Sequence, residues 1–399
     1  MKRIWGVRIV SIAIVVVLFA VLLSGCASTD LLPESTESGG AQSSQDQTPT
    51  LPNSTGNAYN VNISSSPIPE NSSQTTADVV ERVRDSVVEI YATLAEGSSS
   101  GSGVIVGLSE EENYVYILTC LHVVEDATEV KVRLTSGTEK NALFVGGNPQ
   151  DDIAVIKIEK PEHVCIATVR DTEQSPVRIG ESAIAIGNAL GTLGGTVTKG
   201  IISATERTTR IEGYSMTLLQ TDAAINGGNS GGALFDEYGL LSGIVNAKVV
   251  LTEVEGIGYA IPVATAVQNA TALIETAGNS QYNGYGYIEG QKLLGITTVA
   301  YTENSTSNYL YQISDYQNYG SLSPYILNGT VKTGDYIVMV DGKQLTDATT
   351  FDTLMQEKSI GDSVTLTLRR YGYGMFAEPT EYDVTFPMRQ YVYGYIPTL

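Results

Sequence analysis

The sequence predicts a mainly β protein, with an all-β domain followed by a small αβ domain. From Ala77 onwards, short apolar and β-branched runs such as GSGVIVG and TEVKVRLTSG are each closed by Gly, Asn, Asp or Pro. Their spacing is typical of strands in an antiparallel barrel or sandwich. Near Gln281 the composition becomes rich in Tyr and Gly. With 399 residues, 42% of them hydrophobic, the chain can form two or three domains with their own cores.

Local patterns place the main elements of both domains. Residues 77–94 predict a short amphipathic helix that leads into a strand, and residues 262–278 predict a helix that caps the all-β domain and stops at its final glycine. In the second domain, Asp341-Gly342 between apolar runs indicates a hairpin. Helical spacing follows over Phe351–Lys358, and strand alternation over Ser363–Arg369. These elements fit an αβ module of roughly 100 residues.

The charge of the chain limits its partners. The formal net charge is −21 at pH 7. Binding to nucleic acid without regard to sequence requires a basic footprint, and so does electrostatic adhesion to anionic lipid. We therefore expect peptide or protein partners and no nucleic acid.

The N-terminus resembles an export signal with a lipid attachment site. Three basic residues precede the apolar run Ile9–Leu23, which is short for a membrane-spanning helix. The run ends in Leu23-Ser24-Gly25-Cys26, which resembles the lipobox of bacterial lipoproteins. This predicts removal of residues 1–25 and acylation of Cys26. An uncleaved signal anchor over Val7–Leu23 is the alternative; both place the chain outside the cytoplasm, tethered to a membrane.

Polar residues dominate the next segment. Residues 27–76 are rich in Ser, Thr, Gln, Asn, Gly and Pro without an apolar period, which predicts a flexible tether. Two further cysteines, Cys120 and Cys165, lie in neither a CxxC motif nor a small disulfide-dense domain. Buried free thiols are the preferred interpretation, and one disulfide between them is the alternative.

Three residues in separate β-rich contexts suggest nucleophilic catalysis. Ser230 lies in INGGNSGGAL, where glycines allow backbone N–H groups to approach a ligand closely. His122 ends the apolar run ILTCLHVV, and Asp152 opens the buried run DDIAVIKI, where a carboxylate requires a partner such as an imidazole N–H. His163, the second histidine, lies in a polar segment and is expected to be solvated. The order His, Asp, Ser within an all-β domain is that of the chymotrypsin-type triad.

Residues 77 to about 390 resemble a trypsin-like serine protease of the HtrA/Deg family with a C-terminal PDZ domain. The matching stretches, in chain order, are Gly101-Ser102-Gly103-Val104, Thr119-Cys120-Leu121-His122-Val123-Val124, Asp152-Ile153-Ala154-Val155, Ala185-Ile186-Gly187-Asn188, Gly200-Ile201-Ile202-Ser203, Gln220-Thr221-Asp222-Ala223, Gly228-Asn229-Ser230-Gly231-Gly232 and Gly258-Tyr259-Ala260-Ile261-Pro262. The resemblance implies a chymotrypsin-like double β-barrel over 77–278 and a PDZ-like domain over 281–392.

The resemblance also implies roles for individual residues. His122 is the expected general base, Asp152 its orienting acid and Ser230 the nucleophile, with the N–H groups of Gly228 and Ser230 as the oxyanion hole. No metal or cofactor is required. The residues expected to form the wall of the S1 pocket are Ile244, Val245, Asn246 and Ala247. No aspartate stands there, so a small or medium aliphatic P1 residue is expected; a turn-capping role is the alternative for Asn246.

The second domain is expected to bind peptides. Leu294-Gly295-Ile296 resembles the carboxylate-binding loop of PDZ domains, which capture peptides by strand addition. A purely structural appendage is the alternative, and the C-terminal YGYIPTL is expected to extend past the fold. The family implies cleavage of misfolded or unfolded envelope proteins and assembly as a homotrimer. A chaperone that holds clients without turnover is the competing function.

Overall fold

The computed structural model describes the chain from residue 61 onwards, with short gaps. The described residues are 61–69, 74–109, 111, 113–189, 193–211, 214–249, 256–302, 308–372, 378–395 and 397. The predicted signal peptide, Cys26 and most of the predicted tether lie outside them. Among the described residues, no helix combines the length and the apolar character needed to cross a membrane.

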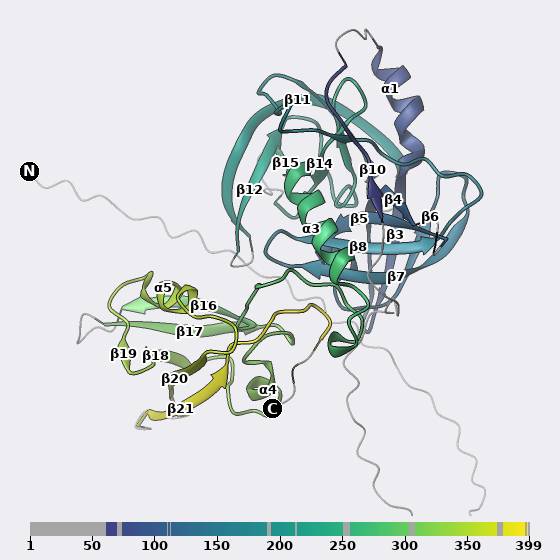
Figure 1. Cartoon of the computed structure of the whole chain (residues 1–399). Helices are drawn as coiled ribbons and strands as arrows, with labels where there is room; N and C mark the ends of the chain where they lie inside the picture. Colours follow the sequence, from purple (N-terminus) through teal and green to yellow (C-terminus); the bar gives the residue numbers. More distant parts are fainter. Residues whose placement is uncertain are drawn as a thin grey trace, which may run out of the picture. The chain divides into compact units, whose positions relative to one another are not determined.

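Six strands form a first closed barrel. They are β3 (Val87–Leu94), β4 (Ser98–Ser109), β5 (Tyr114–Cys120), β6 (Ala127–Arg133), β7 (Glu139–Asn148) and β8 (Ile153–Glu159). Hydrogen bonding runs in the order β4-β3-β6-β7-β8-β5, and β5 pairs back onto β4 (Figure 1). Closure leaves no free edge between these six strands.

A second closed barrel follows. Its strands are β10 (Ser182–Ala189), β11 (Leu193–Ile211), β12 (Tyr214–Thr221), β13 (Ala233–Phe235), β14 (Leu241–Val245) and β15 (Gly258–Pro262). The order is β13-β10-β11-β12-β15-β14, closed by the pairing of β13 with β14. The predicted chymotrypsin-like double barrel is therefore confirmed.

Part of the predicted tether is ordered. The short strand β1 (Asn62–Ile63) pairs with β4, and β2 (Ser65–Ser66) pairs in parallel with β9 (Val169–Arg170), which lies beside β14. The prediction of a tether as far as residue 76 is wrong for these strands, because their backbone groups pair with β4 and β9, which composition cannot reveal.

The helices of this region form where the sequence predicts them. Helix α1 (Thr76–Val83) begins with a capping box between Thr75 and Asp78 and leads through the 3₁₀ turn η1 (Arg84–Ser86) into β3. Helix α3 (Val263–Thr276) packs against β7, β8 and β14. Gly278, with φ of +86°, follows it as the predicted stop, since this conformation favours glycine.

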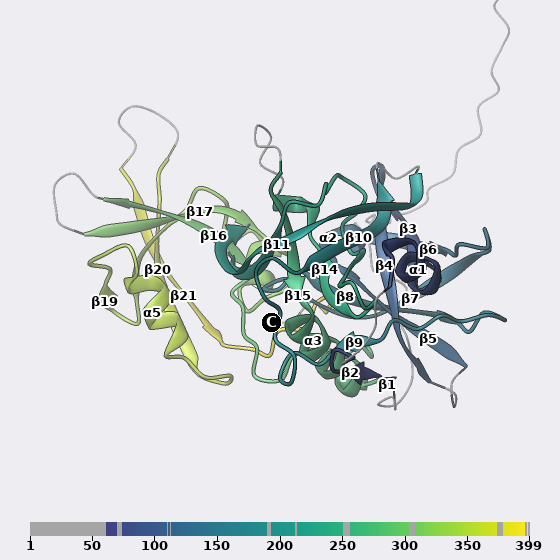
Figure 2. The same cartoon turned by 90° about the horizontal axis from the view of Figure 1, so that it is seen from above.

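The second domain is a sheet covered by a helix. Its strands are β16 (Ile296–Thr302), β17 (Tyr309–Tyr316), β18 (Tyr336–Val340), β19 (Lys343–Gln344), β20 (Ser363–Arg370) and β21 (Thr380–Pro387). Helix α4 (Ser323–Leu327) and helix α5 (Thr350–Gln356) complete the domain, and Phe351 of α5 belongs to its core. Figure 2 shows α5 together with strands of this domain. Asp341 and Gly342 have φ of 49° and 72°, which matches the predicted tight hairpin.

Aromatic residues that precede and follow this domain in the sequence pack into the core of the barrels. The rings of Tyr285 and Tyr393 lie 5.8 and 5.7 Å from the ring of Phe144 on β7. The Tyr393 hydroxyl accepts a hydrogen bond from the Asp126 amide at 3.2 Å. The expectation that YGYIPTL extends past the fold is therefore wrong at Tyr393, which is 2% exposed. Its partners are far away in sequence, so the C-terminal pattern alone could not reveal them.

Candidate active site

His122 lies in a single helical turn directly after strand β5. The sequence suggested the end of the strand itself, but the strand stops at Cys120 and helix α2 (Leu121–Val124) follows. The Leu121 amide donates to the backbone carbonyl of Asp152 at 3.0 Å, which ties this turn to the start of β8. The helical turn brings the imidazole out of the sheet and toward the second barrel.

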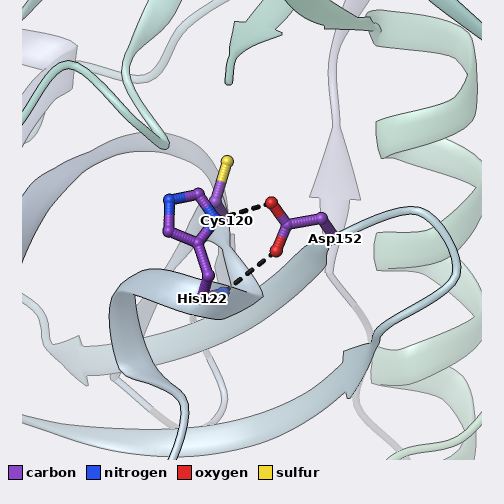
Figure 3. Close-up of side chains that lie close together, drawn as sticks. All are labelled: Cys120, His122 and Asp152. Carbon is purple, nitrogen blue, oxygen red and sulfur yellow. Dashed lines mark hydrogen bonds and ion pairs between the residues drawn. The ribbon is translucent and has the colours of Figure 1, made fainter. Parts of the chain in front are cut away.

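Asp152 holds His122 through both of its carboxylate oxygens. Its Oδ1 accepts the His122 backbone N–H at 3.0 Å, and its Oδ2 lies 2.6 Å from His122 Nδ1 (Figure 3). A third donor, Asn246 Nδ2, approaches Oδ2 at 2.9 Å. Asp152 is 7% exposed and has φ of +51°, a conformation that is uncommon outside glycine. Three hydrogen bonds thus stabilise a buried carboxylate.

Ser230 reaches His122 from the second barrel. It lies in the loop between β12 and β13, and its Oγ is 2.9 Å from His122 Nε2. The Ala247 amide also donates to this oxygen, at 3.1 Å. The Ser102 amide of β4 donates to the Ser230 carbonyl at 2.8 Å. The first barrel therefore supplies His122 and Asp152, the second supplies Ser230, and the three meet where the barrels adjoin.

The glycines around Ser230 serve two different needs. Gly228 and Gly231 have φ of +90° and +81°. At Gly231 a Cβ would also lie 2.2 Å from the Ser102 carbonyl and 2.3 Å from Thr119 Oγ1, so no side chain fits. At Gly227 a Cβ would meet no atom within 4 Å. Gly231 is thus required both by its positive φ and by packing against the first barrel, Gly228 is favoured by its positive φ, and Gly227 is required by neither.

The loop also presents backbone donors beside the nucleophile. In the described part of the chain, no hydrogen bond engages the amide nitrogens of Gly228 and Ser230. The carbonyl of Gly228 accepts from Ser102 Oγ at 2.8 Å, and the same hydroxyl accepts from the Asn188 amide at 2.8 Å. Ser102, a fully buried serine of β4, thus orients the peptide that follows Gly228. We did not predict this role.

The four residues predicted for the S1 wall differ in side-chain exposure. Ile244 and Val245 are fully buried in β14, and their side chains pack into the cores. Asn246 is also buried, and its amide is directed at Asp152. Only Ala247 is partly exposed. The side chains of Ile244, Val245 and Asn246 therefore do not line an accessible pocket, because β14 belongs to the closed barrel as far as residue 245.

Cys120 lies close to His122 and Asp152. Its Sγ, a His122 ring nitrogen and an Asp152 oxygen lie within 4.8 Å of one another, a potential metal-binding set (Figure 3). However, the 2.6 Å between Nδ1 and Oδ2 is a hydrogen-bond distance, and ligands on one tetrahedral zinc lie farther apart. Burial, with a further contribution from the Asp152 charge, raises the pKa of the Cys120 thiol well above its usual range. The cluster fits a hydrogen-bonded relay with a neutral thiol beside it.

The other predicted polar residues are placed as follows. Cys120 and Cys165 are both free thiols, which agrees with the preferred interpretation, but Cys165 is only partly buried. His163 is exposed, in agreement with its predicted solvation.

The predicted carboxylate loop of the second domain lines an open cavity. Leu294, Gly295 and Ile296 line a space of about 810 Å³ together with Phe351 and Met355 of helix α5, and Gln150, Asp151, Tyr214 and Ser215 of the first domain line it as well. Gly295 has φ of +79°. The structure therefore places the three predicted residues together at a groove between a strand and a helix.

Two six-stranded barrels with a Ser–His–Asp relay where they adjoin define the trypsin-like serine protease fold. Residues 101–244 match the family model of the trypsin-like peptidase domain, and residues 317–374 match the model of the PDZ domain. The chain belongs to the HtrA family of serine proteases, and it carries the PDZ domain predicted from its sequence.

Sequence similarity to three named HtrA and DegP proteases supports this assignment. The chain is 35% identical over 297 residues to the serine protease Do-like HtrA of Bacillus subtilis, covering 70% of this chain and 63% of that protein. It is 34% identical over 285 residues to the Do-like HtrA of Lactobacillus helveticus, covering 69% and 67%. It is 35% identical over 280 residues to the periplasmic serine endoprotease DegP of Escherichia coli K12, covering 68% and 54%. A solved serine endoprotease from Yersinia pestis is 31% identical with a TM-score of 0.47, covering 80% and 99%. The chain thus spans between half and two thirds of the length of the Bacillus subtilis and Escherichia coli proteins.

Proposed function

We propose that this protein is a serine endopeptidase of the cell envelope that cleaves unfolded or misfolded proteins. The observation that carries the proposal is the relay in which His122 lies 2.6 Å from Asp152 Oδ2 and 2.9 Å from Ser230 Oγ. A carboxylate only accepts hydrogen bonds, so the His122 Nδ1 carries the proton and Nε2 is free to accept the hydroxyl proton of Ser230.

The geometry supports acyl transfer. As Ser230 Oγ attacks a peptide carbonyl, His122 takes its proton at Nε2 and later gives it to the leaving amine. Asp152 stabilises the imidazolium without taking its proton. The amides of Gly228 and Ser230 are the proposed donors to the developing oxyanion, a type of contact whose removal typically raises the barrier by about 3 kcal/mol.

Fluorophosphonate labelling tests the proposal, because such probes react only with an activated serine. We expect the wild-type protein to be labelled and to hydrolyse casein, and Ser230→Ala to do neither while its melting temperature stays nearly unchanged. His163→Ala is the matched control, since this exposed histidine lies outside the relay. A protein that only holds clients would leave the probe unreacted. Casein hydrolysis by folded Ser230→Ala would refute the assignment.

We further propose that the PDZ domain binds the C-termini of unfolded proteins. The carbonyls of Leu293, Leu294 and Gly295 accept hydrogen bonds from Ser321, Leu322 and Gln317. In a trans peptide the N–H points opposite to the preceding carbonyl, so the amides of residues 294–296 point away from the segment 317–322. Amides arranged in this way suit a terminal carboxylate.

An apolar peptide with a free C-terminus is expected to stimulate turnover of a small chromogenic substrate. If the protease alternates between an active and an inactive conformation, a tenfold stimulation requires that the peptide prefer the active one by about 1.4 kcal/mol. The same peptide with a C-terminal amide is the control, and equal effects of both would contradict carboxylate recognition. A change in KM for protein substrates alone would indicate docking without regulation. Deletion of residues 281–399 is unsuitable, because it removes Tyr285 and Tyr393 from the core of the barrels.

Envelope anchoring and oligomeric state complete the proposal. The lipobox-like sequence supports acylation of Cys26 and tethering to the membrane, with an uncleaved anchor as the alternative. Assembly as a homotrimer is proposed from family membership alone.

A further inference from the structure

One short turn after strand β14 contacts both the acid and the nucleophile of the relay. Asn246 Nδ2 donates to Asp152 Oδ2 at 2.9 Å, and the next amide, that of Ala247, donates to Ser230 Oγ at 3.1 Å. Asn246 Oδ1 accepts the Lys248 amide at 3.1 Å and thereby closes the turn, which continues as η2 (Ala247–Val249). Asn246 is 1% exposed, so bulk water cannot replace these contacts.

Hydrogen-bonding chemistry fixes the orientation of the Asn246 amide. The Asp152 carboxylate offers only acceptors, so it must face the NH₂ end. The Lys248 backbone N–H is only a donor, so it must face the carbonyl end. Reversing the amide would oppose donor to donor and acceptor to acceptor. The residue therefore uses both ends of its side chain, which neither leucine nor aspartate can reproduce.

We infer that Asn246 is a positioning residue for the relay rather than part of the substrate-binding wall. The inference rests on the proposed function. Through Nδ2 it fixes the rotation of the Asp152 carboxylate, and with it the tautomer and orientation of His122. Through Oδ1 it closes the turn that places the Ala247 amide on a lone pair of Ser230 Oγ. With that lone pair occupied, the hydroxyl proton is directed to His122 Nε2.

The consequence for kinetics separates the two roles. A residue of the substrate wall affects binding and raises KM when it is replaced. A residue that aligns the relay affects the chemical step, so its loss lowers kcat and leaves KM for a small substrate nearly constant. Hydrogen bonds to charged groups are strong enough that losing this one is expected to lower kcat about tenfold to a hundredfold.

The test compares Asn246→Leu and Asn246→Asp with wild type in kcat and KM for a chromogenic peptide and in melting temperature. Both variants are close to asparagine in size. Aspartate can still accept from Lys248 but opposes the Asp152 carboxylate, so it is expected to be no more active than leucine. Both should show the kcat loss with KM changed less than about threefold.

Asn269→Leu is the matched control, because Asn269 is a buried asparagine that donates to the neighbouring Asp151 at 2.9 Å. It is expected to lower stability without lowering kcat. A second pair, Asn246→Ser and Asn246→Ala, differs by one hydroxyl donor, and the serine variant should have the higher kcat. If the leucine and aspartate variants do not fold, the comparison of kcat between the serine and alanine variants tests the inference.

Three outcomes would overturn the inference. They are wild-type kcat in folded Asn246→Leu, an increase in KM at constant kcat, and equal kcat in the serine and alanine variants. Failure of the proposed function is recognised separately, since it would appear as turnover by Ser230→Ala.

Discussion

Asp152→Asn is expected to lower kcat about 10⁴-fold while leaving the fold intact. Among the described residues, the groups that hydrogen-bond to the carboxylate at 2.6 to 3.0 Å are donors: the His122 backbone N–H, His122 Nδ1 and Asn246 Nδ2. The backbone N–H cannot become an acceptor, so the new amide directs its oxygen there and its NH₂ group toward the ring. His122 must then carry its proton on Nε2, where it can no longer accept the proton of Ser230.

Steady-state kinetics on a chromogenic peptide, with circular dichroism and thermal unfolding of the same samples, measure this effect. Asp151→Asn is the control, because the neighbouring carboxylate bonds to Asn148 and Asn269 and does not contact His122. A kcat within tenfold of wild type in folded Asp152→Asn would mean that the carboxylate does not set the tautomer.

Gly231→Ala is expected to destabilise the protein by more than about 4 kcal/mol, a magnitude reserved for a few mechanisms such as strain at a special φ/ψ. Its φ of +81° is unfavourable for alanine, and the new Cβ would lie 2.2 Å from the Ser102 carbonyl and 2.3 Å from Thr119 Oγ1. Ser102 and Thr119 belong to β4 and β5, both buried in the first barrel, so neither can move away cheaply.

The free energy of unfolding in urea measures the loss. Gly227→Ala, four positions earlier, is the control: its Cβ enters open space, and it should unfold within about 1 kcal/mol of wild type. If the two variants had equal stability, close packing would not be the reason for a glycine at position 231.

Most of the fold could be predicted because its signals are local. The helix at Val263–Thr276 follows from small and apolar residues before a glycine, and the hairpin at Asp341-Gly342 from a dipeptide that tolerates positive φ. The local sequence did not predict that His122 lies in a helical turn. The apolar run continues through LHVV, and only the hydrogen bond from Leu121 to the Asp152 carbonyl shows why the strand ends and turns helical.

By itself, the sequence determined the two β-rich domains and the order of His122, Asp152 and Ser230, because strand periodicity, glycine content and residue chemistry are properties of short segments. Only the tertiary structure decided what surrounds them. Asn246 bonds to a carboxylate 94 positions away, Ser102 to the Gly228 carbonyl 126 positions away, and Tyr393 to an amide 267 positions away. Such contacts depend on how closed barrels bring distant strands together, and no local pattern encodes which polar side chain will meet which partner.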